Sequence, residues 1–213
     1  MPNLTLRRGI AASGAVIVAL ALAACGTPPW AVNTPTPVES AAPSASVAEP
    51  SPSITVPPPV PNDLSSGSTQ RTITAGAVTA TINYWSTLRL DKWTPNALKP
   101  ITMSLVATLT PASKQKVYIQ SATMTAVPAN GSQTFSALAP QADQSATTPG
   151  YLAKDPYSYS QTFNTGSVPD EATYVTLNFQ YDFLIQTTPT STEYQKQTAT
   201  DSVTVAIAPQ PAG

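Results

Sequence analysis

The stretch VTLNFQYDFLI, residues 175–185, has the clearest pattern in the chain. Large apolar side chains stand at every second position, with Thr176, Asn178 and Gln180 between them. Successive side chains of a β-strand point to opposite faces, so this period of two predicts a strand with one buried face. Its length and its aromatic and β-branched residues predict a central strand in which Phe179 faces the core.

Shorter stretches repeat the alternation, and no segment shows a sustained helical period. Four further segments read as strands: 78–84, 101–109, 157–163 and 203–207. Segment 117–126 also alternates, but its apolar positions change from odd to even, which predicts a β-bulge near Gln120 or Ser121. Asn130-Gly131 is the dipeptide favoured in a type I′ turn, so a hairpin is expected there.

About seven or eight strands without helices predict an all-β sandwich over residues 71–208. The run DEATY, with Asp170, Ala172 and Tyr174, resembles the tyrosine corner before the penultimate strand of immunoglobulin-like domains. This resemblance implies an immunoglobulin-like sandwich. Thr176 stands where that family often has cysteine, so no inter-sheet disulfide is expected.

The first 25 residues have the order of an export signal: Arg7 and Arg8, an apolar run over 10–22, then the motif LAAC at 22–25. This motif resembles the lipobox of bacterial lipoproteins. The resemblance implies cleavage between Ala24 and Cys25 and attachment of acyl chains, such as palmitate, to Cys25. The apolar run is shorter than the roughly 20 residues that span a bilayer.

The lipobox resemblance places the mature protein at the extracytoplasmic face of the bacterial cell membrane. Two or more acyl chains anchor a protein stably, whereas one binds only marginally. The membrane is therefore an expected partner, held through Cys25. An ordinary signal peptide with an incidental cysteine is the alternative, and export by the general or the twin-arginine route is left open.

Residues 25–70 are expected to form a disordered tether behind the lipidated cysteine. Eleven prolines lie between Pro28 and Pro61, and large apolar side chains are few. Proline removes backbone donors, and too little apolar surface remains to offset the entropy of folding. The tether is interpreted as a spacer rather than a recognition motif, and residues 209–213 as a flexible tail.

The composition narrows the function classes. Histidine is absent, and the single cysteine is the expected lipid acceptor, so imidazole triads, catalytic thiols and the commonest zinc ligands are not available. No cofactor and no metal site is predicted. Bases and acids are scattered singly through the sandwich sequence, so nucleic acid is not an expected partner.

Aromatic residues are the candidates for a binding surface, since their rings offer large contact area at low entropic cost. The candidates are Trp85, Trp93, Tyr151, Tyr157 and Tyr159. Adjacent strand residues face opposite sides, so Tyr84 or Trp85 is expected in the core. No acid spacing resembles a calcium loop, and no pattern positions Asp182 for a lysine crosslink.

Together these features predict a membrane-anchored surface lipoprotein whose sandwich is a non-enzymatic binding, adhesion or scaffolding module at the cell envelope. Its partner would be an envelope protein or polysaccharide. The alternative is a histidine-independent enzyme, or an accessory domain of one, that acts on cell-wall polymer. A cleft with converging carboxylates or tyrosines favours the enzyme, whereas an exposed apolar or aromatic patch favours the binding module.

Overall fold

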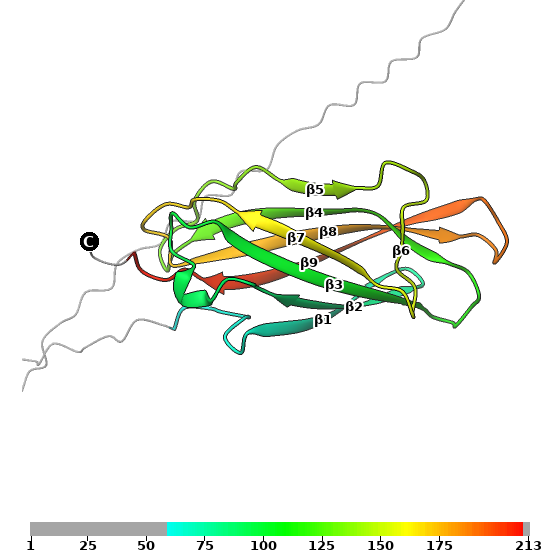
Figure 1. Cartoon of the computed structure of the whole chain (residues 1–213), viewed down its shortest axis with the longest axis horizontal. Helices are drawn as coiled ribbons and strands as arrows, with labels where there is room; N and C mark the ends of the chain where they lie inside the picture. The colour runs from blue at the N-terminus through cyan, green and yellow to red at the C-terminus, as the bar shows by residue number, and fades with distance from the viewer. Residues whose placement is uncertain (1–58, 211–213) are drawn as a thin grey trace, which may run out of the picture. The chain divides into compact units, whose positions relative to one another are not determined.

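The computed structural model describes residues 59–210 (Figure 1). The leader, Cys25, the tether as far as residue 58 and residues 211–213 lie outside the described residues, so the predictions made for them stay predictions. Within residues 59–210, no helix has the length and apolar character needed to cross a membrane. The helical element of this part is a single 3-10 turn, η1 (Leu90–Lys92).

Two antiparallel sheets pack face to face, which confirms the all-β sandwich (Figure 1). The first has the strand order β1-β2-β3-β7 and the second β5-β4-β8-β9, with β6 beside β4. The strands are β1 (Ser68–Ala75), β2 (Val78–Trp85), β3 (Lys99–Leu109), β4 (Val117–Ala129), β5 (Gln141–Gln144), β6 (Tyr151–Leu152), β7 (Tyr159–Thr165), β8 (Tyr174–Gln186) and β9 (Tyr194–Ala206). Strands β5 and β6 are too short to show a period, which is why the sequence predicted fewer.

The connections follow the Greek-key pattern of immunoglobulin-like sandwiches. Strands β1, β2 and β3 pair in succession, the chain crosses to β4 in the second sheet, returns as β7 beside β3, and crosses again to β8 beside β4. The tyrosine corner itself is not formed. The Tyr174 hydroxyl donates to the Asn130 carbonyl at 3.5 Å, because Tyr174 pairs with Ala129 across the sheet and lies beside that loop.

The predicted bulge and the predicted hairpin are confirmed, but the predicted type I′ turn is wrong. Ala129 pairs with Thr134 across the hairpin, and the Asn130 N–H donates to the Gln133 carbonyl at 2.9 Å. The β4–β8 register shifts between Ile119 and Ser121. Gly131 does not have the positive φ that a type I′ turn requires. Instead, the Asn130 side-chain oxygen accepts the backbone N–H groups of Ser132 and Gln133, each at 2.9 Å. This local capping suits Asn130 to a wider turn, and the chain then follows a long connection to β5.

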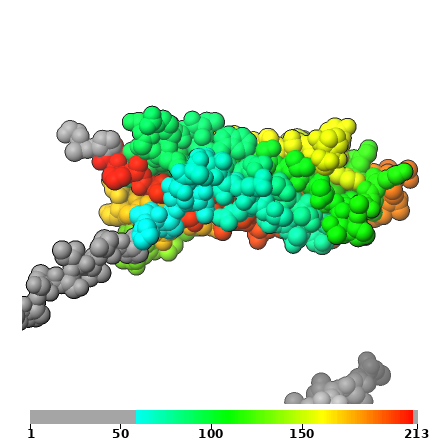
Figure 2. Space-filling model, turned by 90° about the horizontal axis from the view of Figure 1, so that it is seen from below, coloured from blue at the N-terminus to red at the C-terminus, as the bar shows by residue number. Residues whose placement is uncertain are grey.

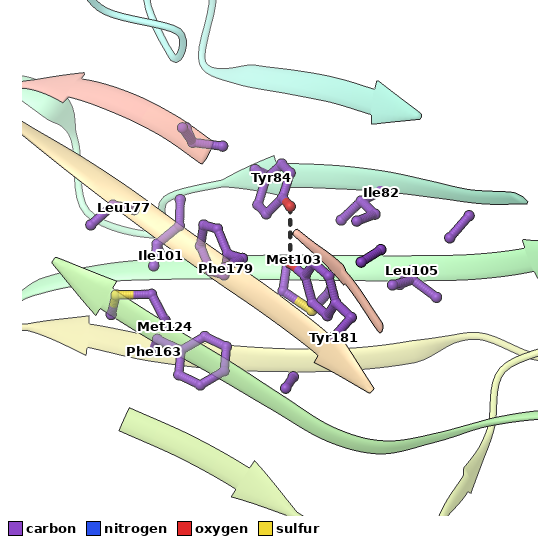
Figure 3. Packing of buried hydrophobic residues seen from close by; sticks show 14 of the residues in the cluster. Ile82, Tyr84, Ile101, Met103, Leu105, Met124, Phe163, Leu177, Phe179 and Tyr181 are labelled. Atoms are coloured by element: carbon purple, nitrogen blue, oxygen red, sulfur yellow. Dashed lines mark hydrogen bonds between the residues drawn. The ribbon is translucent and has the colours of Figure 1, made fainter. Parts of the chain in front are cut away.

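The core is filled from both inner faces, with aromatic rings at its centre (Figure 3). Phe179 is 1% exposed and Gln180 is exposed, as the period of two predicted. The Phe179 ring lies 5.0 Å from the Tyr84 centroid and 6.1 Å from that of Tyr181. The two tyrosine hydroxyls are 2.9 Å apart, and Tyr84 also donates to Asp201 at 2.9 Å, so these two buried hydroxyls are paired.

The domain begins earlier than predicted. Leu64 is fully buried, and the Asp63 backbone N–H donates to the Thr204 carbonyl at 2.7 Å. In return, the Thr204 N–H donates to the Asp63 carboxylate at 2.8 Å, and that carboxylate pairs with Arg71 at 2.9 Å. The boundary at Arg71 was placed too late because β1 is an edge strand whose outward residues are as polar as the tether.

The sandwich has two distinct ends, a base and a tip. The base is the end where Asp63 meets β9, where η1 and Trp93 lie, and where the Ala208 N–H donates to the Trp93 carbonyl at 3.0 Å. The tip is the opposite end, formed by the turn at 76–77 and the loops 110–116, 153–158 and 187–193. In Figures 1 and 2 the green and orange loops of the tip lie opposite the red C-terminal end of the described chain.

Candidate functional site

The five candidate aromatic residues do not form one surface. Trp93 is fully buried and Tyr159 is 5% exposed, so both belong to the core. Trp85 is half-buried on the outer face of the first sheet, next to buried Tyr84 as expected. Tyr151 and Tyr157 are exposed, on β6 and in the following loop. The sequence could not separate these roles, because an aromatic residue fits a core and a binding surface equally well.

The structure does bring Tyr151 and Tyr159 together. Their ring centroids are 5.5 Å apart, with 34° between the ring planes. The Tyr159 hydroxyl donates to the Asp143 carboxylate at 2.6 Å, which links β7 of the first sheet to β5 of the second. These residues line a hollow of about 410 Å³ with Ser158, Ser160 and Gln161. We call it the tyrosine hollow.

A glycine positions Tyr151. Gly150 has a φ of 109°, in a region that L side chains rarely adopt, and a Cβ there would collide with the Ile119 carbonyl oxygen. The chain therefore passes close to β4, and β6 pairs with β4 through Tyr151–Ile119 and Leu152–Tyr118. This pairing holds Tyr151 at the sheet edge with 43% of its surface exposed.

Beyond the tyrosine hollow, the side chain of Gln141 joins β5 to β7. The Gln141 side chain donates to the Asn164 carbonyl, and its oxygen accepts the Asn164 N–H at 3.0 Å. It thus pairs with β7 as a strand backbone would, and it fixes β5 against the first sheet. The tyrosine hollow therefore has rigid walls, which reduces the entropic cost of binding.

The polar groups of the hollow favour hydrogen bonding over ionisation of the phenol. Burial raises the pKa of Tyr159, and the hydrogen bond to Asp143 and the charge of that carboxylate raise it further. Tyr159 therefore stays protonated and keeps its hydroxyl on Asp143. Asp143 is the one acid lining this hollow in the described part of the chain.

A larger hollow, of about 590 Å³, lies over the outer face of the second sheet. It is lined mainly by short hydroxyl and amide side chains of three strands: Thr123, Thr125, Asn178, Gln180, Thr200 and Ser202. The carboxylate of Asp201, which also borders it, accepts the hydroxyl of Tyr84. We regard the smaller tyrosine hollow as the better candidate, because it combines an exposed ring with a carboxylate.

A further polar cluster surrounds Asp182 at the bulge, where sequence reasoning saw no site. The Asp182 carboxylate accepts the hydroxyls of Ser121 at 2.9 Å and Thr198 at 2.7 Å, and it pairs with Lys196 at 3.0 Å. Burial opposes ionisation, but these hydrogen bonds and the lysine charge hold the pKa of Asp182 below its usual value. The cluster is a satisfied ion pair within the sheet.

Lys99 is the most unusual charged residue of the base. It is fully buried, and its ammonium donates to the carbonyls of Thr94, Pro95 and Ala97 at 3.2, 3.0 and 2.7 Å. Burial lowers the pKa of Lys99 to about 8. No sequence pattern predicts that Lys99 is buried, because Lys99 directly precedes Pro100 at the start of β3 and the carbonyls that accept its protons belong to an irregular loop.

Within residues 59–210, no group of three or more histidine, cysteine, aspartate or glutamate side chains is placed to hold a metal ion. No protein-family model matches the chain, and no curated protein is significantly similar to it.

Proposed function

We propose that this protein is a lipoprotein of the bacterial cell envelope, anchored through acyl chains on Cys25, whose sandwich binds a glycan chain in the tyrosine hollow. The anchor is supported by the order of the first 25 residues and by the LAAC motif. The glycan is supported by the exposed Tyr151 ring beside Asp143, which is the observation that carries the binding proposal.

The chemistry of the hollow suits a sugar. A tyrosine ring gives a flat apolar surface on which the apolar face of a sugar ring can lie. A carboxylate accepts hydrogen bonds from hydroxyl groups, and such charge-assisted bonds are stronger than neutral ones. The side chains of Ser158, Ser160 and Gln161 add further donors and acceptors around the same space. The volume of about 410 Å³ is in the range of small-ligand sites.

The anchor is tested by replacing Cys25 with serine in the producing cell. The substitution removes the sulfur that would accept the lipid, so the protein should stay unprocessed or leave the membrane fraction. Cell fractionation and the mass of the mature N-terminus measure this. A cleaved Cys25→Ser protein that stays in the membrane fraction and needs detergent for release would contradict the lipoprotein assignment.

The binding site is tested with the Tyr151→Ala variant. Sedimentation with purified bacterial cell walls, followed by titration with soluble wall glycans, should show about a tenfold loss of affinity, as expected for truncation of a central aromatic contact. Trp85→Ala is the matched control, since Trp85 is an aromatic residue on β2 that does not line the tyrosine hollow. Equal losses in the two variants, or none in Tyr151→Ala, would remove the tyrosine hollow from consideration.

A further inference from the structure

The tip collects basic side chains that are far apart in sequence. Lys114 and Lys116 in the β3–β4 loop and Lys154 in the β6–β7 loop line one hollow of about 230 Å³, together with Gln115, Leu152, Asp155 and Tyr157. Lys114 and Lys116 are exposed, and Tyr157 is 57% exposed. We call this the lysine hollow.

The loops around the lysine hollow are tied to one another. The Lys154 ammonium donates to the carbonyls of Ser113 and Gln115, the latter at 2.9 Å. The Gln115 side chain in turn donates to the carbonyls of Gln186 and Thr187 at 2.7 and 2.8 Å. The Asp155 N–H donates to the Ala107 carbonyl at 3.0 Å. The lysines are therefore presented on a fixed support and not on loose loops.

The charges of the lysine hollow are not balanced locally. Three lysines face one acid, Asp155, among its lining residues. Lys196 does not add to the surplus, because it is paired with Asp182 at 3.0 Å. Glu193 belongs to the neighbouring β8–β9 loop, beyond the hollow's lining. An exposed surplus of ammonium groups attracts phosphate or carboxylate groups, and it does so most strongly at low salt.

The lysine hollow adjoins the tyrosine hollow. Tyr151 lines the tyrosine hollow, and Leu152, the next residue of β6, lines the lysine hollow. Tyr157 and Ser158, adjacent in the next loop, likewise line the lysine hollow and the tyrosine hollow. Because adjacent strand residues face opposite sides, a linear polymer contacts both hollows by passing around the edge of β6.

We infer that the bound glycan is anionic, with its phosphate or carboxylate groups at Lys114 and Lys116 and a sugar ring on Tyr151. This inference rests on the proposed glycan binding. Asp143 repels an anionic group but accepts hydrogen bonds from hydroxyls, so the two hollows together select a chain in which charged groups alternate with hydroxyl-bearing rings. Single-stranded DNA fits this arrangement less well, because its deoxyribose rings carry no free hydroxyl within the chain to donate to Asp143.

The test uses the mature chain with Cys25→Ser, so that no lipid interferes. Its affinity is measured at low and high salt for poly(N-acetylglucosamine 1-phosphate), polygalacturonate, neutral dextran and single-stranded DNA. The two anionic polymers distinguish phosphate from carboxylate as the preferred group. The protein should bind at least one of them more tightly than dextran and DNA, and that preference should weaken as salt is raised.

The Lys114→Gln/Lys116→Gln variant should bind the preferred anionic polymer about tenfold more weakly at low salt, with a smaller loss at high salt. The matched control is Arg89→Gln/Lys92→Gln, which removes two exposed basic residues from the base and should change the affinity little. Equal losses in both variants, no loss in the tip variant, or equally tight binding of DNA would overturn the inference.

The Tyr151→Ala variant separates this inference from the proposed function. Its loss of affinity should be similar at low and high salt, because contact with a neutral ring is not screened. If Tyr151→Ala binds as tightly as the parent while the tip variant is weakened, the tyrosine hollow is wrong and the charged tip stands. If Tyr151→Ala is weakened and the tip variant is not, the tyrosine hollow stands and the binding role of the charged tip is wrong.

Discussion

The base and the tip of the sandwich handle their polar and aromatic residues in opposite ways. At the base, Trp93 and Lys99 are fully buried and each is hydrogen-bonded within the protein. At the tip, Lys114 and Lys116 are exposed and Tyr157 is 57% exposed. The same residue types thus stabilise the fold at one end and remain available to solvent at the other.

This difference shows where substitutions should affect stability and where they should affect binding. Burying a lysine is unfavourable unless its protons are satisfied, and the three carbonyls around Lys99 satisfy them. An exposed lysine costs nothing to keep in water and contributes little to stability. The base should therefore be sensitive to substitution in unfolding experiments, and the tip should be tolerant.

The largest expected loss of stability follows from replacing Trp93. Its ring is fully buried, and its Nε1–H donates to the Ser86 hydroxyl at 3.1 Å. Trp93→Ala leaves a cavity and removes one of the hydrogen bonds of the Ser86 hydroxyl, so the free energy of unfolding should fall by about 3 to 5 kcal/mol. Urea denaturation measures this. Tyr157→Ala at the tip is the paired control and should stay within about 0.5 kcal/mol of the parent. Similar losses at both ends would remove the contrast.

A smaller effect is expected from the titration of Lys99. Its pKa is about 8 in the folded protein and 10.5 when unperturbed. Between these values the unfolded chain binds more protons than the folded one, so raising the pH disfavours unfolding. The free energy of unfolding should rise by up to about 2 kcal/mol between pH 8 and pH 10. Denaturant melts across this range measure the rise.

The Lys99→Met variant is the control, and its stability should not rise over that range. Above pH 10 the free energy of unfolding should fall in both proteins. Burial raises the pKa of Tyr84, Tyr159 and Tyr181 in the folded state, so the unfolded chain loses its phenolic protons first and is favoured by further alkali. An identical rise in Lys99→Met would assign the effect to another group.

The smallest effect concerns the clasp between Asp63 and β9. Asp63→Ala removes the acceptor for the Thr204 N–H and the partner of Arg71, so the free energy of unfolding should fall by about 1 kcal/mol. Asp155→Ala removes an exposed acid at the tip, and its midpoint should hardly move. If the urea midpoint of Asp63→Ala equals that of the parent, the domain starts at β1 and the clasp is dispensable.

The sequence predicted the features that depend on local pattern. Strand β8, the buried position of Phe179 and the bulge at Ile119–Ser121 were visible because one buried face imposes a period of two, and a bulge breaks it. The hairpin at Asn130 was predicted correctly, but its turn type was not. The dipeptide Asn-Gly suits a type I′ turn, but the side chain of Asn130 stabilises a different one.

The candidate sites depend on contacts between segments far apart in the chain, and sequence alone could not place them. Asp143 meets Tyr159 only because β5 lies at the edge of one sheet and β7 at the edge of the other. The lysines of the tip are separated by some 40 residues, so the sequence showed them as scattered charges. Trp93 was a candidate binding residue by sequence, but the fold buries it completely.

The opposite placement of base and tip also sets the direction in which a pulling force would act. Strand β1 runs from the base to the tip and is joined to β2 by eight residue pairs. If the proposed glycan is held at the tip, tension between it and residue 59 is directed along these strands. It loads their hydrogen bonds in shear, all at once, and not one after another as in peeling. Resistance then depends on the rate of forced unfolding and not on equilibrium stability.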